Sequence, residues 1–106
     1  MRPLTFAAAM LVAIPPALAF GQTAMTAAPH PYVGLWVTDD GHVRHELLPN
    51  NRYDEARGRR ESAYRGRYEV TGTRIEYRDD TGFTADGDFV DENTLHHAGM
   101  ILRRQR

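Results

Sequence analysis

The side chains best suited to acid–base chemistry or metal binding are five histidines and a group of carboxylates, in a chain that contains no cysteine. His42 and His45 are three residues apart, and His96 and His97 are adjacent, so the members of each pair would face opposite sides of a strand. Neither pair could bind one metal ion within its own strand. A zinc site would need His45 together with His97 or His96 from another strand. We therefore predict no metal site.

A second group is the acidic segment 79–88, which holds four aspartates. Its spacing does not fit the EF-hand calcium loop, because no glutamate closes it and no glycine takes the sixth position. We expect the aspartates to accept hydrogen bonds from backbone N–H groups in a turn. Asp86 and Asp88 could instead pair with arginines of adjacent strands. A third interpretation is a polar ligand site, because loops at the end of a barrel often carry such sites.

Acid–base catalysis could use His45, Glu55 or Asp80, with tyrosines orienting a substrate. However, the sequence has no cysteine, no Gly-x-Ser-x-Gly motif and no glycine-rich phosphate loop, so the usual nucleophile and nucleotide signatures are missing. The 13 basic residues, all arginine, are balanced by 14 acidic ones, which gives a net charge of −1. This balance argues against a nucleic-acid partner and predicts surface ion pairs. We predict no cofactor.

The N-terminal segment has the pattern of a secretory signal. Arg2 precedes a short apolar run over residues 4–14, two prolines end this run, and Ala17-Leu18-Ala19 fits a cleavage site. The run is too short for a comfortable membrane anchor. We expect residues 1–19 to be removed near Ala19 and the mature chain to be periplasmic or secreted, without a membrane association. Residues 20–31, rich in Ala, Thr and Pro, are predicted to form a flexible arm.

The rest of the chain shows alternating runs separated by turn residues, and no window has a helical period. Gly99 interrupts the final run, either as a bulge in one strand or as the corner between two, so we expect seven or eight strands. Short turns make an antiparallel meander, and closing it removes its exposed edges. Residues 32–106 are therefore predicted to form one small all-β, up-and-down barrel. The expected strands are 32–37, 42–48, 52–57, 63–70, 73–78, 83–90 and 94–104.

The polar pattern of two strands bears on the barrel interior. His45 shares a strand face with apolar neighbours, which predicts that its imidazole points inward. Tyr53, Glu55 and Arg57 share a face of the next strand. This face is either solvated or lines a wet cavity in which Arg57 pairs with Glu55, because a closed core rarely buries an unpaired glutamate. The scarcity of apolar residues after position 19 gives weight to the cavity.

The only tryptophan lies in Gly34-Leu35-Trp36, on the first expected strand. An arginine of the last strand, Arg103 or Arg104, could stack on its indole. A Gly-x-Trp opening on strand one resembles the calycin group of barrels, which includes lipocalins, fatty-acid-binding proteins and avidin-like proteins.

Three further stretches resemble a family of small bacterial proteins of unknown function with a streptavidin-like fold. They are residues 44–57, with Arg44-His45-Glu46-Leu47-Leu48-Pro49-Asn50 running into Arg52-Tyr53-Asp54-Glu55-Ala56-Arg57, then Asp79 to Phe89, and finally His97-Ala98-Gly99-Met100. The match runs from Tyr32 to Arg104, and the secretory leader is a departure from it. Asn51 also stands where a glycine is expected in a turn, a change that asparagine tolerates. The resemblance implies an eight-stranded antiparallel barrel or sandwich and a ligand-binding surface, but no ligand or reaction.

The leading hypothesis is an exported, avidin-like protein that binds an unidentified small molecule at its open end and interior, without catalysis. Tyrosines would supply contact area and polar residues would orient the ligand. The alternatives are a protein-binding module or inhibitor of the cell envelope, using the charged outer strand faces, and an acid–base enzyme. The sequence leaves the oligomeric state open. The expected ligand-binding residues are His45, Tyr53, Glu55, Tyr64, Tyr68, Tyr77, Asp80, Phe83, Asp86 and His97.

Overall fold

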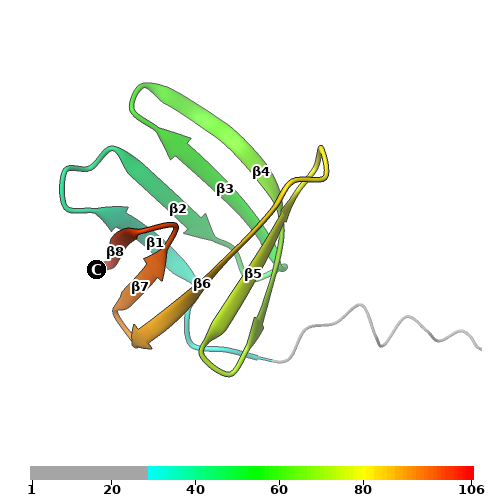
Figure 1. The fold of residues 1–106 in the computed structure, drawn as a ribbon, viewed down its shortest axis with the longest axis vertical. Coiled ribbons are helices and arrows are strands. Elements are labelled where there is room, and N and C mark those ends of the chain that lie inside the picture. The colour runs from blue at the N-terminus through cyan, green and yellow to red at the C-terminus, as the bar shows by residue number, and fades with distance from the viewer. Residues whose placement is uncertain (1–28) are drawn as a thin grey trace, which may run out of the picture.

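The computed structural model describes residues 29–106, so the predicted signal over 1–19 and most of the predicted arm lie outside the described residues. Eight antiparallel strands pair in sequence order, and β1 also pairs with β8, which closes the barrel (Figure 1). The prediction of a small all-β, up-and-down barrel is confirmed. No helix within residues 29–106 is long and apolar enough to cross a membrane. The strands are β1 (Gly34–Thr38), β2 (Val43–Leu47), β3 (Arg52–Arg57), β4 (Arg60–Thr71), β5 (Arg74–Asp79), β6 (Thr84–Asp91), β7 (Thr94–His97) and β8 (Met100–Gln105).

The corner around Gly99 decides the strand count. His97 pairs with Met100 across a two-residue loop. Both loop residues, Ala98 and Gly99, have positive φ angles, of 51° and 77°. Two successive positive φ angles are typical of the type I′ hairpin turn, whose twist matches that of the flanking strands. Gly99 therefore lies in the corner between β7 and β8, and the barrel has eight strands.

Strand β4 starts earlier than the alternation predicted, at Arg60 rather than at residue 63. Arg57 pairs with Arg60, and the register then shifts so that Glu55 pairs with Tyr64. Ser62 has a φ of 50° within this bulge, which absorbs the extra residues of β4. The bulge therefore lies in the β3–β4 hairpin next to Glu55.

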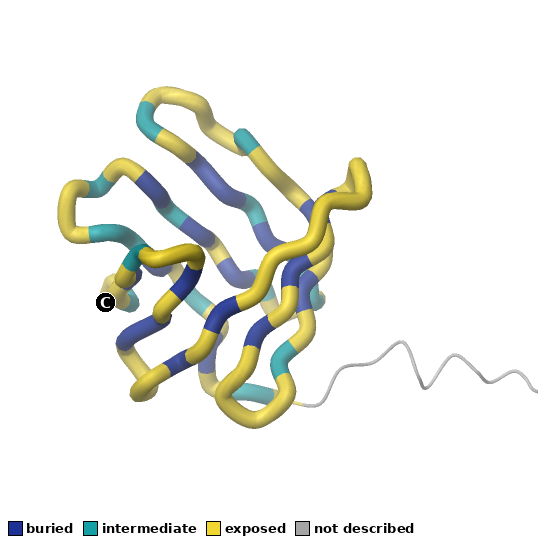
Figure 2. Tube along the Cα trace, in the orientation of Figure 1, coloured by how far each residue is buried: buried dark blue, intermediate teal, exposed yellow. Residues whose placement is uncertain are grey.

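The core fills the barrel with the inward side chains of all eight strands, and buried and exposed residues alternate along most of them (Figure 2). Trp36 is fully buried and packs against Tyr32 and Phe89. The indole Nε1–H donates to the carbonyl of Tyr32 at 2.9 Å. Arg104 covers the other side, with its guanidinium carbon 4.8 Å from the indole centroid, which confirms one of the two arginines expected there. The core cluster comprises Tyr32, Trp36, Val43, Leu47, Tyr53, Tyr68, Ile75, Tyr77, Phe89, Leu95 and Leu102.

Arg104 also fastens one end of the barrel. Its guanidinium donates to the carbonyls of Pro31, Val33 and Glu92 at 2.6, 3.0 and 2.7 Å. It thereby ties the segment before β1 to the corner between β6 and β7. We call this end, which also holds the β2–β3 and β4–β5 corners, the closed end. The opposite end, with the β1–β2, β3–β4, β5–β6 and β7–β8 corners, is the mouth (Figure 1).

Candidate functional site

A cavity of about 240 Å³ lies at the mouth of the barrel. Seven of the ten predicted ligand-binding residues line it, and four lining residues were not among those predicted. The seven are His45, Tyr53, Glu55, Tyr64, Tyr77, Phe83 and His97, and the four are Arg57, Asp79, Thr84 and Ala85.

The cavity wall is built from cross-strand neighbours. His45 on β2 lies opposite Glu55 on β3, which lies opposite Tyr64 on β4. One residue from each of three adjacent strands therefore forms a row across the inside of the sheet. Glu55 is only 5% exposed, so the face it shares with Tyr53 is turned into the barrel and not toward solvent.

Glu55 and Arg57 form an ion pair at the edge of this row. The Arg57 Nε–H donates to Glu55 Oε2, and the Arg57 guanidinium lies 4.8 Å above the ring of Tyr64. The Arg57 side chain remains 44% exposed at the mouth. The interpretation of this face as the wall of a cavity in which Arg57 pairs with Glu55 thus describes the structure, whereas a solvated face does not.

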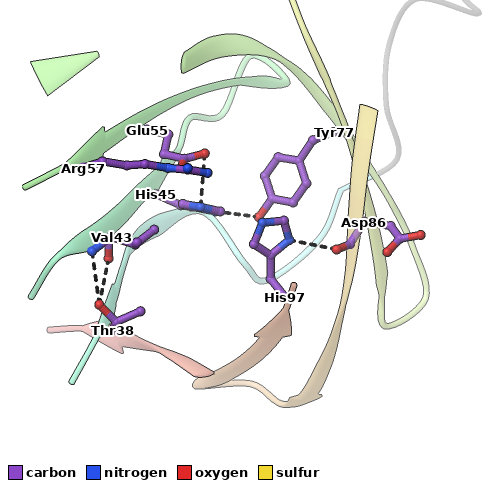
Figure 3. A network of polar contacts seen from close by, with 8 residues as sticks. All are labelled: Thr38, Val43, His45, Glu55, Arg57, Tyr77, Asp86 and His97. Carbon is purple, nitrogen blue, oxygen red and sulfur yellow. Dashed lines mark hydrogen bonds and ion pairs between the residues drawn. The ribbon is translucent and has the colours of Figure 1, made fainter. Parts of the chain in front are cut away.

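His45 lies at the bottom of the cavity and is fully buried. Its Nδ1 is 2.9 Å from the Tyr77 hydroxyl (Figure 3). Its Nε2 is 3.4 Å from Glu55 Oε1, but the geometry is not that of a hydrogen bond, so this buried nitrogen has no hydrogen-bond partner among the described residues. Such an atom costs free energy, because it has lost water without gaining a protein partner.

Burial determines the protonation of His45 and Tyr77. Desolvation, reinforced by electrostatic repulsion from His97 and Arg57, lowers the pKa of His45 to about 3, so its ring is neutral near pH 7. Desolvation, with the charge of Glu55 adding to it, raises the pKa of Tyr77 well above its ordinary value. Tyr77 is therefore protonated and donates to His45 Nδ1, its one hydrogen-bond partner among residues 29–106. The ring hydrogen of His45 then sits on Nε2, which faces the carboxylate of Glu55.

His97 completes the inner wall from β7. Its ring centroid is 5.0 Å from that of His45 and 5.2 Å from that of Tyr77. His97 Nδ1 is 2.8 Å from the backbone carbonyl oxygen of Asp86 (Figure 3). A carbonyl can only accept, so Nδ1 carries the hydrogen, and in the neutral ring Nε2 offers a lone pair. Within residues 29–106, no group of three or more His, Asp or Glu side chains is arranged to hold a metal ion.

Tyr68 was expected in the ligand site, but the structure places it at the closed end. Its hydroxyl donates to the carbonyl of Leu48 at 2.8 Å and is 3.0 Å from His30 Nε2. Burial raises the pKa of Tyr68 to about 12. Tyr64 and Tyr68 share the inward face of β4, but four residues separate them by roughly 13 Å along the strand. Only Tyr64 therefore reaches the mouth.

Two predicted aspartates also lie away from the cavity. Asp80 is on the outer surface and forms two hydrogen bonds with the Arg52 guanidinium, at 2.9 and 2.7 Å. The Asp86 carboxylate points outward to Arg74 at 2.7 Å, and Asp88 lies 3.9 Å from the same arginine, as expected for ion pairs between strands. Only the backbone oxygen of Asp86 contributes to the site, through His97.

Asp79 lines the cavity and was not among the predicted site residues. Its Oδ1 accepts hydrogen bonds from the backbone N–H groups of Thr81 and Phe83 and from the Thr81 hydroxyl, at 2.8 to 3.0 Å. Desolvation raises the pKa of Asp79, but these hydrogen bonds outweigh it and hold the pKa below its ordinary value. The turn interpretation of this acidic segment is thus confirmed for Asp79. Strand alternation could have identified Asp79, since it shares the buried face of β5 with Tyr77.

Arg57 was considered as a partner of Glu55, and the structure shows that pairing. Thr84 and Ala85 begin β6 at the mouth, beside the β5–β6 corner. Phe83 precedes them and is 74% exposed at the edge of the cavity. The mouth therefore has an apolar edge on the side of β6 and a charged edge on the side of β3.

Comparison with known proteins gives one family and one solved structure. The family model of the Agrobacterium tumefaciens protein Atu4866 matches residues 29–104. The solution structure of the protein Atu4866 from Agrobacterium tumefaciens is similar, with 68% sequence identity and a TM-score of 0.66. This similarity covers 74% of this chain and 100% of that chain. No curated protein matches the chain. Since the family match spans well over half of its residues, the chain belongs to the Atu4866 family of uncharacterised bacterial proteins.

Proposed function

We propose that the protein binds a small molecule in the cavity at the mouth of its barrel, without catalysing a reaction. The observation that carries this proposal is His45 Nε2, a buried nitrogen that has no hydrogen-bond partner among residues 29–106 and belongs to a side chain lining the cavity. Most buried polar atoms in folded proteins are satisfied, so an exception beside a cavity suggests a functional constraint.

The polarity of the cavity wall adds support. Glu55 is almost completely buried while its partner Arg57 is partly exposed at the mouth, so the burial of this carboxylate costs desolvation free energy that an apolar side chain would avoid. His45 and His97 also place polar atoms where leucine or phenylalanine would pack. A chain that keeps these groups around a cavity loses stability but gains hydrogen-bonding groups for a ligand.

Catalysis is less well supported, although His45 and Glu55 are close together. A histidine whose pKa is about 3 is a weak general base at neutral pH. Asp80, the third residue considered for acid–base chemistry, is on the outer surface in an ion pair with Arg52. A binding site needs neither a base nor a nucleophile, and the lining supplies aromatic area and fixed polar groups.

Ligand binding can be tested by a thermal-shift screen of metabolites and cofactors. A ligand of the native state raises the melting temperature with increasing concentration. Ala85→Trp places an indole in the mouth without removing a polar group, whereas Ala63→Trp places the same side chain outside the residues that line the cavity. We expect hits that A85W loses and A63W keeps. A screen without hits, or hits that survive in A85W, would contradict a mouth site.

The proposal includes export to the periplasm or the cell exterior, based on the sequence pattern over residues 1–19. Mass spectrometry of the protein from fractionated cells tests it. We expect a chain that starts near Phe20 in the periplasmic or external fraction. Replacing Arg2 and interrupting the apolar run with a charged residue should leave a longer chain in the cytoplasm. An unprocessed chain in the cytoplasm of wild-type cells would exclude export.

A further inference from the structure

The charges around the cavity suggest which ligands it excludes. Glu55 and Arg57 neutralise each other at the mouth. Asp79 adds a carboxylate whose lowered pKa keeps it ionised. His45 is neutral near pH 7. Apart from His97, the lining residues therefore carry a net negative charge near neutrality, which disfavours an anionic ligand. A cationic ligand would have to compete with Arg57 for Glu55.

The hydrogen bonds around the cavity suggest what a ligand must provide. Tyr77 gives its only hydrogen to His45 Nδ1, so its oxygen retains acceptor capacity. His97 gives its Nδ1 hydrogen to the Asp86 carbonyl, and its Nε2, which accepts a hydrogen bond whenever the ring carries a single hydrogen, has no hydrogen-bond partner among the described residues. Tyr77 and His97 therefore present acceptors, whereas the unpartnered Nε2–H of His45 is a donor. A ligand that donates a hydrogen bond is complementary to the side of the wall formed by His97.

Size and shape narrow the choice further. A volume of about 240 Å³ corresponds to roughly eight water molecules at their liquid volume. Tyr53 and Tyr77 meet edge to face with centroids 4.9 Å apart, and the His45 and Tyr77 rings do the same at 5.2 Å. Flat walls of this kind pack well against a planar ring, through stacked or edge-to-face contacts. One ring or two fused rings would fill the cavity.

We infer that the cavity selects an uncharged, planar heterocycle that donates an N–H hydrogen bond to Nε2 of His97. This inference rests on the proposed function and names the chemical class of the ligand. His97 is then the specificity-determining residue. His45 holds the Tyr77 hydroxyl in its donating orientation through Nδ1, and its Nε2–H, which has no hydrogen-bond partner among residues 29–106, is the donor of the cavity wall.

Three bicyclic probes of closely similar shape test the inference. Indole carries the N–H donor, benzofuran has an oxygen in its place, and indole-2-carboxylate keeps the donor but adds a negative charge. Binding of each probe is measured by titrating it into the ¹⁵N-labelled full chain at pH 8 and following the amide chemical shifts. We expect indole to bind about tenfold more tightly than benzofuran, as for one hydrogen bond. We expect the carboxylate to bind more weakly than indole, with all shifts near the mouth.

The variant His97→Phe keeps an aromatic ring but removes the acceptor. It should bind benzofuran about as well as the wild type and lose the preference for indole. Tyr68→Phe, which removes a buried hydroxyl at the closed end, is the matched control and should keep the preference. Because the wild-type comparison of indole with benzofuran requires no substitution, the test remains decisive even if H97F is unstable.

The outcomes separate the inference from the proposed function. Equal affinity for indole and benzofuran, or tighter binding of the carboxylate, overturns the inference while leaving a ligand site at the mouth. A preference for indole that persists in folded H97F overturns the role of His97. If no probe binds and the thermal-shift screen finds no other ligand, the proposed function fails and the inference fails with it.

Discussion

His45 and Tyr77 are hydrogen-bonded across the barrel interior, with 2.9 Å between Nδ1 and the hydroxyl oxygen, although their strands β2 and β5 are not neighbours in the sheet. Both side chains are buried, so the bond is shielded from water. Through this contact a hydroxyl on β5 sets the position of the hydrogen on an imidazole of β2. The polarity of the cavity floor is thus a product of barrel closure.

Removing the Tyr77 hydroxyl should destabilise the fold. Tyr77→Phe leaves His45 Nδ1 buried without a partner, at a cost of about 1–3 kcal/mol. The free energy of unfolding from urea denaturation, followed by tryptophan fluorescence, measures this cost. Tyr53→Phe is the control, since the Tyr53 hydroxyl has no hydrogen-bond partner among the described residues, and it should change stability by about 0.5 kcal/mol or less. Equal effects of the two substitutions would argue against the His45–Tyr77 bond.

His45 should make stability depend on pH. Its pKa in the folded state is about 3, whereas the unfolded chain protonates near the ordinary value of about 6.5. Between these values the unfolded state binds more protons, so the free energy of unfolding falls as the pH is lowered. The contribution of one such group is at most about 1.4 kcal/mol per pH unit. The loss should begin near pH 6.5 and cease near pH 3.

The variant His45→Gln isolates this contribution. Burial and the charge of Arg104 also lower the pKa of His30, which adds a loss of the same sign in both proteins. The informative quantity is the slope of unfolding free energy against pH, measured by urea titrations between pH 4.5 and 6.5 in steps of about half a unit. We expect a shallower slope in H45Q. Parallel slopes would show that His45 is not held neutral in the folded state.

Arg104 should contribute far more to stability than its neighbour Arg103. Arg104→Ala removes donors to three carbonyls and the contact with Trp36, at a cost of about 1–3 kcal/mol. Arg103 is exposed, and its nearest acid is Asp39 at 3.4 Å, so R103A should cost about 0.5 kcal/mol or less. Thermal unfolding by circular dichroism compares the two. A smaller loss of stability in R104A than in R103A would contradict a stabilising role for the Arg104 hydrogen bonds at the closed end.

Gly66 should be among the least replaceable residues. A Cβ there would lie 2.1 Å from the Arg78 carbonyl oxygen and 2.5 Å from the Asp79 Cα, so β4 and β5 would have to separate. We expect Gly66→Ala to cost about 3 kcal/mol or more, or to prevent folding. Gly72→Ala meets no atom within 4 Å, and its φ of 62° predicts a loss of only about 1 kcal/mol. Soluble yield and urea denaturation distinguish the two. A G66A protein as stable as G72A would refute the close approach.

Alternation along the strands predicted much of this structure. It placed His45 inside and identified the meander, because a half-buried strand repeats every two residues. Alternation predicted correctly which side chains point inward, but it did not predict how far along the barrel axis each one lies. Tyr64 and Tyr68 both point inward, yet one lies at the mouth and the other contacts His30 at the closed end. Residue type carries no mark of position along the barrel axis.

Asp86 shows a second limit of prediction from strand alternation. The alternation on β6 places its carboxylate outward, where the structure shows it, but its backbone oxygen meets His97. Backbone contacts leave no trace in residue type. The grouping of His45, Tyr77 and His97 likewise depends on barrel closure, which brings three non-adjacent strands together around one space. Local patterns cannot specify such an arrangement.

The seam between β1 and β8 has a practical consequence. Leu35 pairs with Gln105, so the described chain enters and leaves the barrel side by side at the closed end, with the mouth at the other end. A surface, dye or fusion partner attached after β8, at the C-terminal end, would therefore leave the cavity unobstructed.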